Sequence, residues 1–228
     1  MQGLNLANIP EIDEKDNSLI IAITGGIASG KSEVAKIISE MGFVVISTDY
    51  LAKKVMSDDM DVINQIIASF GTDSFIENKV NSKYLSDIVF NSSEKLNQLN
   101  SIVHPPVIEM MIREIEFQIS KGFNPVFVES ALIYEAGLDE GFDYIVCVTS
   151  SNDNRVKRAI SRTGLSKEDI LKRMKEQISQ DEKVKLADFT IQNDGTLDDL
   201  KKSVEFLMPI LTSLPPRNNY SFIEDDSE

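Results

Sequence analysis

The sequence has one cysteine, no secretory leader pattern and no apolar run long enough to cross a membrane. Among 228 residues only Cys147 carries a thiol, so an intramolecular disulfide is excluded, as is usual in a reducing cytosol. Apolar runs such as LIIAI fall far short of the roughly 20 residues that a spanning helix needs. The N-terminus lacks the basic and hydrophobic regions of a secretory signal. We therefore expect a cytoplasmic protein.

Positive charge is also scarce. The chain has 23 Lys and Arg against 37 Asp and Glu, for a net charge of −14. Nucleic acids and anionic membranes are bound through basic surfaces, so neither is an expected partner. The acidic ends, 1–17 and 217–228, are expected to be solvated tails. Residues 155–175 are locally basic, which favours a specific anionic ligand.

Short apolar runs alternate with helical patterns along the chain. Strands are expected at 19–23, 43–46, 125–129, 143–148 and 188–192. Their near-continuous hydrophobicity is typical of parallel strands buried on both faces. Helices are expected at 31–41, 48–56, 60–69, 82–121, 152–162, 166–187 and from Thr196, which forms a capping pair with Asp199. This alternation predicts an α/β layered fold, with a helical subdomain in the long interval between the second and third strands.

The stretch TGGIASGKSE, directly after the first strand, fits the phosphate-loop pattern G-x-x-x-x-G-K-[ST]. Glycines allow backbone N–H groups to point at phosphate oxygens, and the following helix adds its positive N-terminal end. Lys31 is expected to reach the β- and γ-phosphates, and Ser32 to ligate Mg²⁺. The residues expected to contact ATP are Gly25, Gly26, Ile27, Ala28, Ser29, Gly30, Lys31, Ser32 and Glu33. A glycine-rich turn without function is disfavoured, because the pattern lies between a strand and a helix.

A carboxylate for the acceptor hydroxyl is available in VVISTDYLA. The N-K-x-D motif of GTPases is absent, which favours a kinase that orients its acceptor with an Asp or Glu. Asp49 lies just past the second strand, at the sheet edge where ligands of open α/β sheets bind. From position alone, Asp49 is equally well explained as the cap of the next helix.

Five further segments in a fixed order carry a family resemblance. They are STDYLA, LNSIVHPPVI, ESALIYEAGL, RVKRAISRTGLS and KVKLADFTIQNDG. Together with TGGIASGKS they resemble the dephospho-CoA kinase family, whose motifs include T-G-G-I-G-S-G-K-S, D-A-D-x-x-A and H-P-x-I. The resemblance covers residues 19 to about 211.

This resemblance implies a three-layer P-loop kinase fold with a mostly parallel five-stranded sheet, a helical substrate subdomain and a helical lid. The single kinase domain is expected at 18–216. Its nucleotide core is expected at 18–47, 122–151 and 187–216, the substrate subdomain at 48–121 and the lid at 152–186. The implied reaction transfers the γ-phosphoryl group of ATP to the ribose 3′-hydroxyl of dephospho-CoA.

The resemblance also assigns site residues. Asp49 matches the catalytic carboxylate, while Arg158 and Arg162, at i and i+4 on the expected lid helix, would hold phosphate. Ser47 replaces the first Asp of D-A-D, so water or Glu129 would have to serve the metal instead. Further departures are Ala28 in place of the loop Gly, Glu33 in place of Thr, and Arg155 where Gln is common. Arg155 is left out of the expected site for that reason.

Two remaining segments receive less specific roles. His104 precedes a Pro-Pro pair at an expected helix start, where structural histidines outnumber functional ones, and the resemblance makes it a candidate substrate contact. Asn193 and Gly195, after the last strand, are expected near the adenine.

Alternatives to this reading are another small-molecule or nucleotide kinase, and a non-catalytic ATP-binding module. Retention of Lys31 and Asp49 disfavours the module. A monomer is favoured.

Overall fold

The computed structural model describes residues 18–77, 79–90 and 92–217, so the expected tails lie outside the described residues except for Arg217. The chain divides into two compact units. One contains Ser47–Ile115, and the other contains 18–46 with 116–217. None of the helices within the described residues is long and apolar enough to cross a membrane.

The second unit is built on a five-stranded sheet in the order β2-β5-β1-β6-β7. Its strands are β1 (Ile20–Thr24), β2 (Val44–Ser47), β5 (Val126–Glu129), β6 (Tyr144–Thr149) and β7 (Phe189–Gln192). β1 pairs in parallel with both β5 and β6, and β6 pairs in parallel with β7. All five expected strands are confirmed within a residue or two. Continuous apolar runs marked them because β1, β5 and nearly all of β6 are buried.

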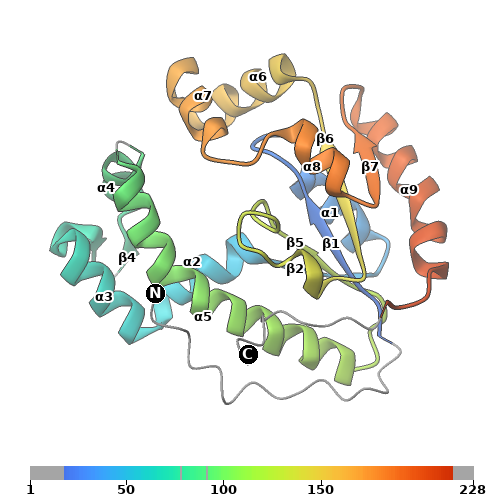
Figure 1. Cartoon of the computed structure of the whole chain (residues 1–228), viewed down its shortest axis with the longest axis horizontal. Helices are drawn as coiled ribbons and strands as arrows, with labels where there is room; N and C mark the ends of the chain where they lie inside the picture. Colours follow the sequence, from blue (N-terminus) through green and yellow to red (C-terminus); the bar gives the residue numbers. More distant parts are fainter. Residues whose placement is uncertain (1–17, 78, 91, 218–228) are drawn as a thin grey trace, which may run out of the picture. The chain divides into compact units, whose positions relative to one another are not determined.

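Helices α1 (Lys31–Glu40) and α9 (Leu197–Ser213) pack together and against this sheet, as Figure 1 shows for α9 beside β7. The core that they share with the strands includes Ile21, Ile23, Val34, Ile38, Val146, Val148, Leu200, Val204 and Met208. The expected capping box at the start of α9 is confirmed, with Thr196 and Asp199 each bonding to the other's backbone. The sequence predicts one apolar stripe along this helix, formed by Leu197, Leu200, Val204, Leu207, Met208 and Leu211. Leu197, in the first turn, is instead 59% exposed.

Between β6 and β7 lie α6 (Asn152–Thr163), α7 (Lys167–Lys175) and α8 (Gln180–Leu186). The expected helix 166–187 is therefore interrupted at 176–179. At this break the Ser179 side chain caps α8 by accepting a hydrogen bond from the Glu182 N–H. The Ile178 N–H in the break donates to the Glu135 carboxylate instead of to a helical carbonyl oxygen, so the helical ladder does not continue through it.

The first unit contains α2 (Thr48–Asp58), α3 (Met60–Phe70), the 3₁₀ turn η1 (Thr72–Ser74) and α4 (Ser82–Val89), with much of α5 (Ser93–Ser120). It also holds a hairpin of two-residue strands, β3 (Phe75–Ile76) and β4 (Lys79–Val80), which is too short to leave an alternating sequence pattern. The expectation of a helix start at the Pro-Pro pair is wrong. α5 continues through Pro105 and Pro106, with the apolar side chains of Val103 and Val107 buried on either side.

Candidate nucleotide-binding site

The loop between β1 and α1 has the geometry of a phosphate cradle. Gly25 lies so close to β6 that a Cβ would be 2.3 Å from the Val148 carbonyl oxygen. Gly30, the N-cap of α1, has a φ of 104°, and a Cβ there would be 2.0 Å from the Asn193 Nδ2. Only glycine fits such positions without displacing the neighbouring strand or side chain. The loop therefore turns tightly and aims the N-terminus of a ten-residue helix at its own centre.

Lys31 and Ser32 share one carboxylate. The Lys31 Nζ is 2.8 Å from Glu129 Oε1, and the Ser32 Oγ donates a hydrogen bond of 2.8 Å to the same oxygen. The side chains of Lys31 and Glu129 are only 13% and 5% exposed, so solvent screens the ion pair weakly. Glu129 ends β5, at the same sheet edge where β1 enters the loop. Sequence reasoning had only its position at a strand end to suggest it.

Asn193 and Arg158 support the loop from the β7 side. The Asn193 Nδ2 donates a buried hydrogen bond of 2.8 Å to the Ser29 carbonyl oxygen. Arg158 donates to the Asn193 carbonyl oxygen at 3.0 Å and to the Ser150 Oγ at 3.3 Å. Arg162, one turn further along α6, is exposed. Asn193 therefore holds the loop directly, and Arg158 holds Asn193. The contacts of these two residues with nucleotide stay a prediction.

The turn after β7 is fixed by Asp194. Its carboxylate accepts hydrogen bonds from the Ser151 N–H, the Ser150 Oγ and the Asn154 Nδ2 at 2.8–2.9 Å. The Ser151 N–H and the Gln192 side chain, followed by Ser150 and Asn154, hold the pKa of Asp194 well below its usual range. The next residue, Gly195, has its Cα so close to α9 that a Cβ would be 2.7 Å from the Asp199 Oδ2. Its expected place near the adenine stays a prediction.

Both backbone polar groups of Ile27 in the loop are bonded to side chains from the α6–α8 region. Its carbonyl oxygen accepts from the Arg155 Nε at 3.0 Å, and its N–H donates to the Gln177 Oε1 at 3.0 Å. Arg155 is 5% exposed, and its guanidinium packs where a Cβ of Gly26 would lie. Burial lowers the pKa of Arg155. The structure therefore places at the loop a residue that the sequence analysis left out.

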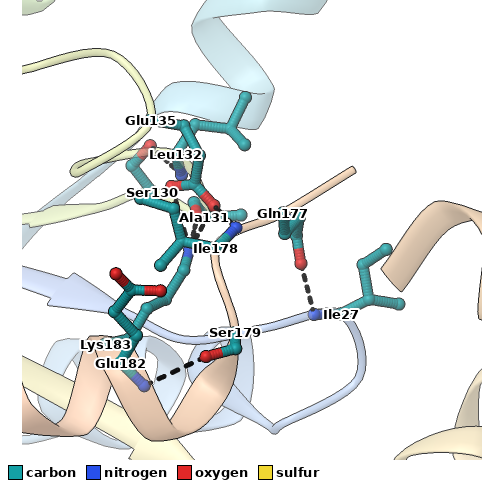
Figure 2. A network of polar contacts seen from close by, with 10 residues as sticks. All are labelled: Ile27, Ser130, Ala131, Leu132, Glu135, Gln177, Ile178, Ser179, Glu182 and Lys183. Carbon is teal, nitrogen blue, oxygen red and sulfur yellow. Dashed lines mark hydrogen bonds and ion pairs between the residues drawn. The ribbon is translucent and has the colours of Figure 1, made fainter. Parts of the chain in front are cut away.

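Lys183 and Glu135 form a largely buried ion pair next to the break between α7 and α8. Figure 2 shows Lys183 pointing into the loop after β5, where its Nζ is 2.7 Å from Glu135 Oε1 and donates to the Ala131 carbonyl oxygen at 2.6 Å. Glu135 also accepts a hydrogen bond of 3.0 Å from the Ile178 N–H. Lys183 is fully buried. The only sequence signal for this pair was that Lys183 begins the segment KVKLADFTIQNDG, which resembles the dephospho-CoA kinase family.

Asp49 and His104 belong to the first unit. Ser47 occupies the N-cap of α2, so Asp49 is a first-turn residue and the alternative that it caps the helix is wrong. Asp49 is exposed. His104 lies inside α5, half-buried, and burial lowers its pKa. The catalytic role of Asp49 and the substrate contact of His104 stay predictions.

The parallel sheet, the glycine turn and the Lys-Ser pair at the start of α1 define a P-loop nucleotide-binding protein of the kinase fold. The family model for dephospho-CoA kinase matches residues 19–199. Curated relatives named dephospho-CoA kinase include one from Chlorobaculum tepidum, 37% identical over 82% of this chain and 92% of its own length. Another, from Fusobacterium nucleatum, is 38% identical over 82% of this chain and 95% of its own length. This chain belongs to the dephospho-CoA kinase family.

Solved structures agree with that membership. A crystal structure from Thermus thermophilus has a TM-score of 0.71 at 29% identity, covering 87% of this chain and all of that one. The dephospho-CoA kinase from Campylobacter jejuni has a TM-score of 0.64 at 27% identity, covering 85% of this chain and 96% of that one.

Proposed function

We propose that this protein transfers the γ-phosphoryl group of ATP to the ribose 3′-hydroxyl of dephospho-CoA, giving coenzyme A and ADP. The observation that carries the proposal is the phosphate loop with Lys31 and Ser32 at the start of α1, in a chain of this family. Such a loop binds the β- and γ-phosphates, and the family supplies the acceptor.

Lys31 would act on the transferring phosphate as a fixed cation. Its Nζ is held by Glu129 beside the N-terminus of α1, so the positive charge is already at the site before nucleotide binds. A preorganised charge stabilises the transition state without a reorganisation cost. We infer that ATP takes over part of the interaction that Lys31 makes with Glu129.

The residues at the loop fit Mg²⁺. Magnesium in kinases is held by one or two protein oxygens together with the phosphates, and the Ser32 hydroxyl and Glu129 carboxylate are hard oxygen donors 2.8 Å apart. No group of three or more His, Cys, Asp or Glu gathers as a metal site in the part of the chain that the structure describes. Ser32, with Glu129 in place of the carboxylate that Ser47 lacks, would therefore hold the ion. When bound, it would neutralise charge on the β- and γ-phosphates.

Asp49 would be the general base. It follows the end of β2 by two residues, at the carboxyl edge of the strands where ligands of such sheets bind. Its carboxylate would orient the 3′-hydroxyl and accept its proton as the oxygen attacks phosphorus. His104 would contact dephospho-CoA from the same unit.

Arg158 and Arg162 would close over the phosphates from α6. Arg158 now donates to neutral oxygens of Ser150 and Asn193, which a phosphate would replace with a charge-assisted bond. Asn193 and Gly195 would lie toward the adenine. In this proposal the lid is 152–186, the substrate subdomain 48–121 and the rest of 18–216 the nucleotide core, in a cytoplasmic monomer.

The test is ATP consumption with Mg²⁺ and each of dephospho-CoA, AMP and adenosine, using wild type, Asp49→Asn and the control Asp58→Asn. Asp58 is exposed at the far end of the same helix. We expect stimulation by dephospho-CoA alone, a loss of about 10²- to 10⁴-fold in Asp49→Asn, and no change in Asp58→Asn. Preference for AMP or adenosine would support a different small-molecule kinase. ATP binding with no stimulating acceptor would support a binding module.

A further inference from the structure

The phosphate loop of this chain rests on α6 and α7 through its apolar side chains. Val156 and Ala159 of α6 form a small buried cluster with Ile170 of α7. The side chains of Ile27 and Ala28 pack against that cluster. The middle of the loop is therefore joined to these helices by packing as well as by hydrogen bonds.

The backbone of Ile27 is held from both sides. Arg155 reaches its carbonyl oxygen from α6, and Gln177 reaches its N–H from the break between α7 and α8, each at 3.0 Å. The two hydrogen bonds thus hold the peptide groups on either side of the Ile27 α-carbon. This contact uses donors and acceptors that would otherwise go to water, so it specifies the orientation of the loop.

The hydrogen bonds from Arg155 and Gln177 form a clamp on Ile27, and the next residue, Ala28, has a strained backbone. Ala28 has a φ of 58°, in the left-handed region that disfavours any side chain with a Cβ. Such strain persists only where the surroundings over-determine the backbone. The bonds to Ile27 and the packing of Ala28 on α6 and α7 are the surroundings that do so here.

Gln177 is itself held in place. The N–H of its neighbour Ile178 donates to Glu135, which is paired with the buried Lys183 (Figure 2). Lys183 holds Glu135, and Glu135 holds the backbone of Ile178. The backbone next to Gln177 is therefore anchored, and the Gln177 side-chain amide is positioned toward the loop.

We propose that Arg155 and Gln177 are positioning residues that hold Ile27, and with it the strained Ala28, in the loop shape that binds nucleotide. Removing their bonds lets the loop relax at Ala28, so the fraction of protein ready to bind ATP falls. The inference rests on the proposed function only in requiring that the loop binds ATP.

The experiment measures the Kd of ATP by calorimetry in Arg155→Met/Gln177→Met. The matched control is Lys157→Met/Glu176→Met, because Lys157 is exposed on the same helix and Glu176 is exposed directly before Gln177 in the break. We expect the Kd to rise about 5- to 30-fold in the first protein, the range given by the usual cost of a left-handed residue. In the control it changes less than about twofold. In steady state the KM for ATP rises, while the KM for dephospho-CoA is unchanged.

Ala28→Gly separates positioning from direct contact. Glycine adopts the left-handed region without strain. In a protein that already carries Ala28→Gly, adding Arg155→Met/Gln177→Met is therefore expected to raise the Kd of ATP by less than about threefold. If the double substitution weakens ATP binding as much with Gly at position 28 as with Ala, the proposal is overturned, because the two side chains would then act on the nucleotide itself. An unchanged Kd in Arg155→Met/Gln177→Met would overturn it as well.

A second measurement covers the case in which the double variant does not fold. In Gln177→Met without nucleotide, hydrogen exchange at the Ile27 amide is expected to accelerate, and unchanged exchange would contradict the clamp. CoA formation by wild type, measured on the same preparations, tests the proposed function separately. If wild type makes no CoA while the Kd pattern holds, the clamp stands and the acceptor assignment fails.

Discussion

Gly30→Ala is the substitution whose effect the structure determines most closely. At a φ of 104° an alanine is strained, by about 1–2 kcal/mol for a left-handed residue. Its Cβ would also be 2.0 Å from the Asn193 Nδ2, so Asn193 must move and abandon the Ser29 carbonyl oxygen. That leaves a buried acceptor without its donor, at a cost of about 1–3 kcal/mol. The two contributions together give about 2–5 kcal/mol.

Gly42→Ala is the matched control. Gly42 has a φ of 93°, but nothing lies within 4 Å of its added Cβ. Both substitutions restrict the unfolded chain equally, which stabilises each protein by about 0.4–1 kcal/mol. The difference between the two variants therefore isolates the displacement of Asn193, about 1–3 kcal/mol.

The assays are urea unfolding of both variants and calorimetric titration with ATP. We expect Gly30→Ala to be less stable than Gly42→Ala by that difference and to bind ATP at least about tenfold more weakly, since 1.4 kcal/mol of loop distortion corresponds to a factor of ten. Gly42→Ala should bind ATP as wild type does. Equal stability of the two variants, or wild-type affinity in Gly30→Ala, would refute the argument that Asn193 supports the loop.

Three further predictions concern charge and burial. Lys183→Met should lower the free energy of unfolding by about 3–5 kcal/mol, because it leaves Glu135, whose side chain is only 15% exposed, without its cation. Lys36→Met, which breaks exposed pairs at 3.8 Å, should cost less than about 1 kcal/mol; equal losses in urea unfolding would contradict this reading. The pKa of His104 is lowered in the folded state, so the unfolded chain binds its proton first and stability should fall as the pH drops below about 6.5. His104→Gln should reduce that slope, and an identical slope in both proteins would show that the histidine does not contribute. Burial raises the pKa of Cys147 to about 11, so a disulfide reagent at pH 8 should label the native protein at least about 100-fold more slowly than the urea-unfolded one, and equal rates would contradict its burial.

Elements with a local cause were predictable from the sequence. The strands carry continuous apolar runs because both faces of the sheet are covered, and α9 begins at Thr196 because its capping box involves residues three apart. The phosphate loop was found for the same reason, since its glycines and Lys31 satisfy requirements within eight consecutive residues.

Features set by distant contacts were not predictable in this way. The break between α7 and α8 depends on bonds from Gln177 to Ile27 and from Ile178 to Glu135, which are far away in the sequence. Arg155 was left out of the expected site because the family often has Gln at its position, and helical spacing alone does not say which of the side chains of α6 meets the loop. Packing of α6 decides that, and it buries Arg155.

The most direct test of the account is the position of the transferred phosphate. Wild-type protein would be incubated with ATP, Mg²⁺ and dephospho-CoA, and the purified product examined by ³¹P–¹H correlation NMR. The account predicts a new phosphomonoester whose phosphorus couples to the ribose H3′, formed together with ADP. A phosphate coupled to H2′, or dephospho-CoA recovered unchanged while ATP is bound, would contradict it.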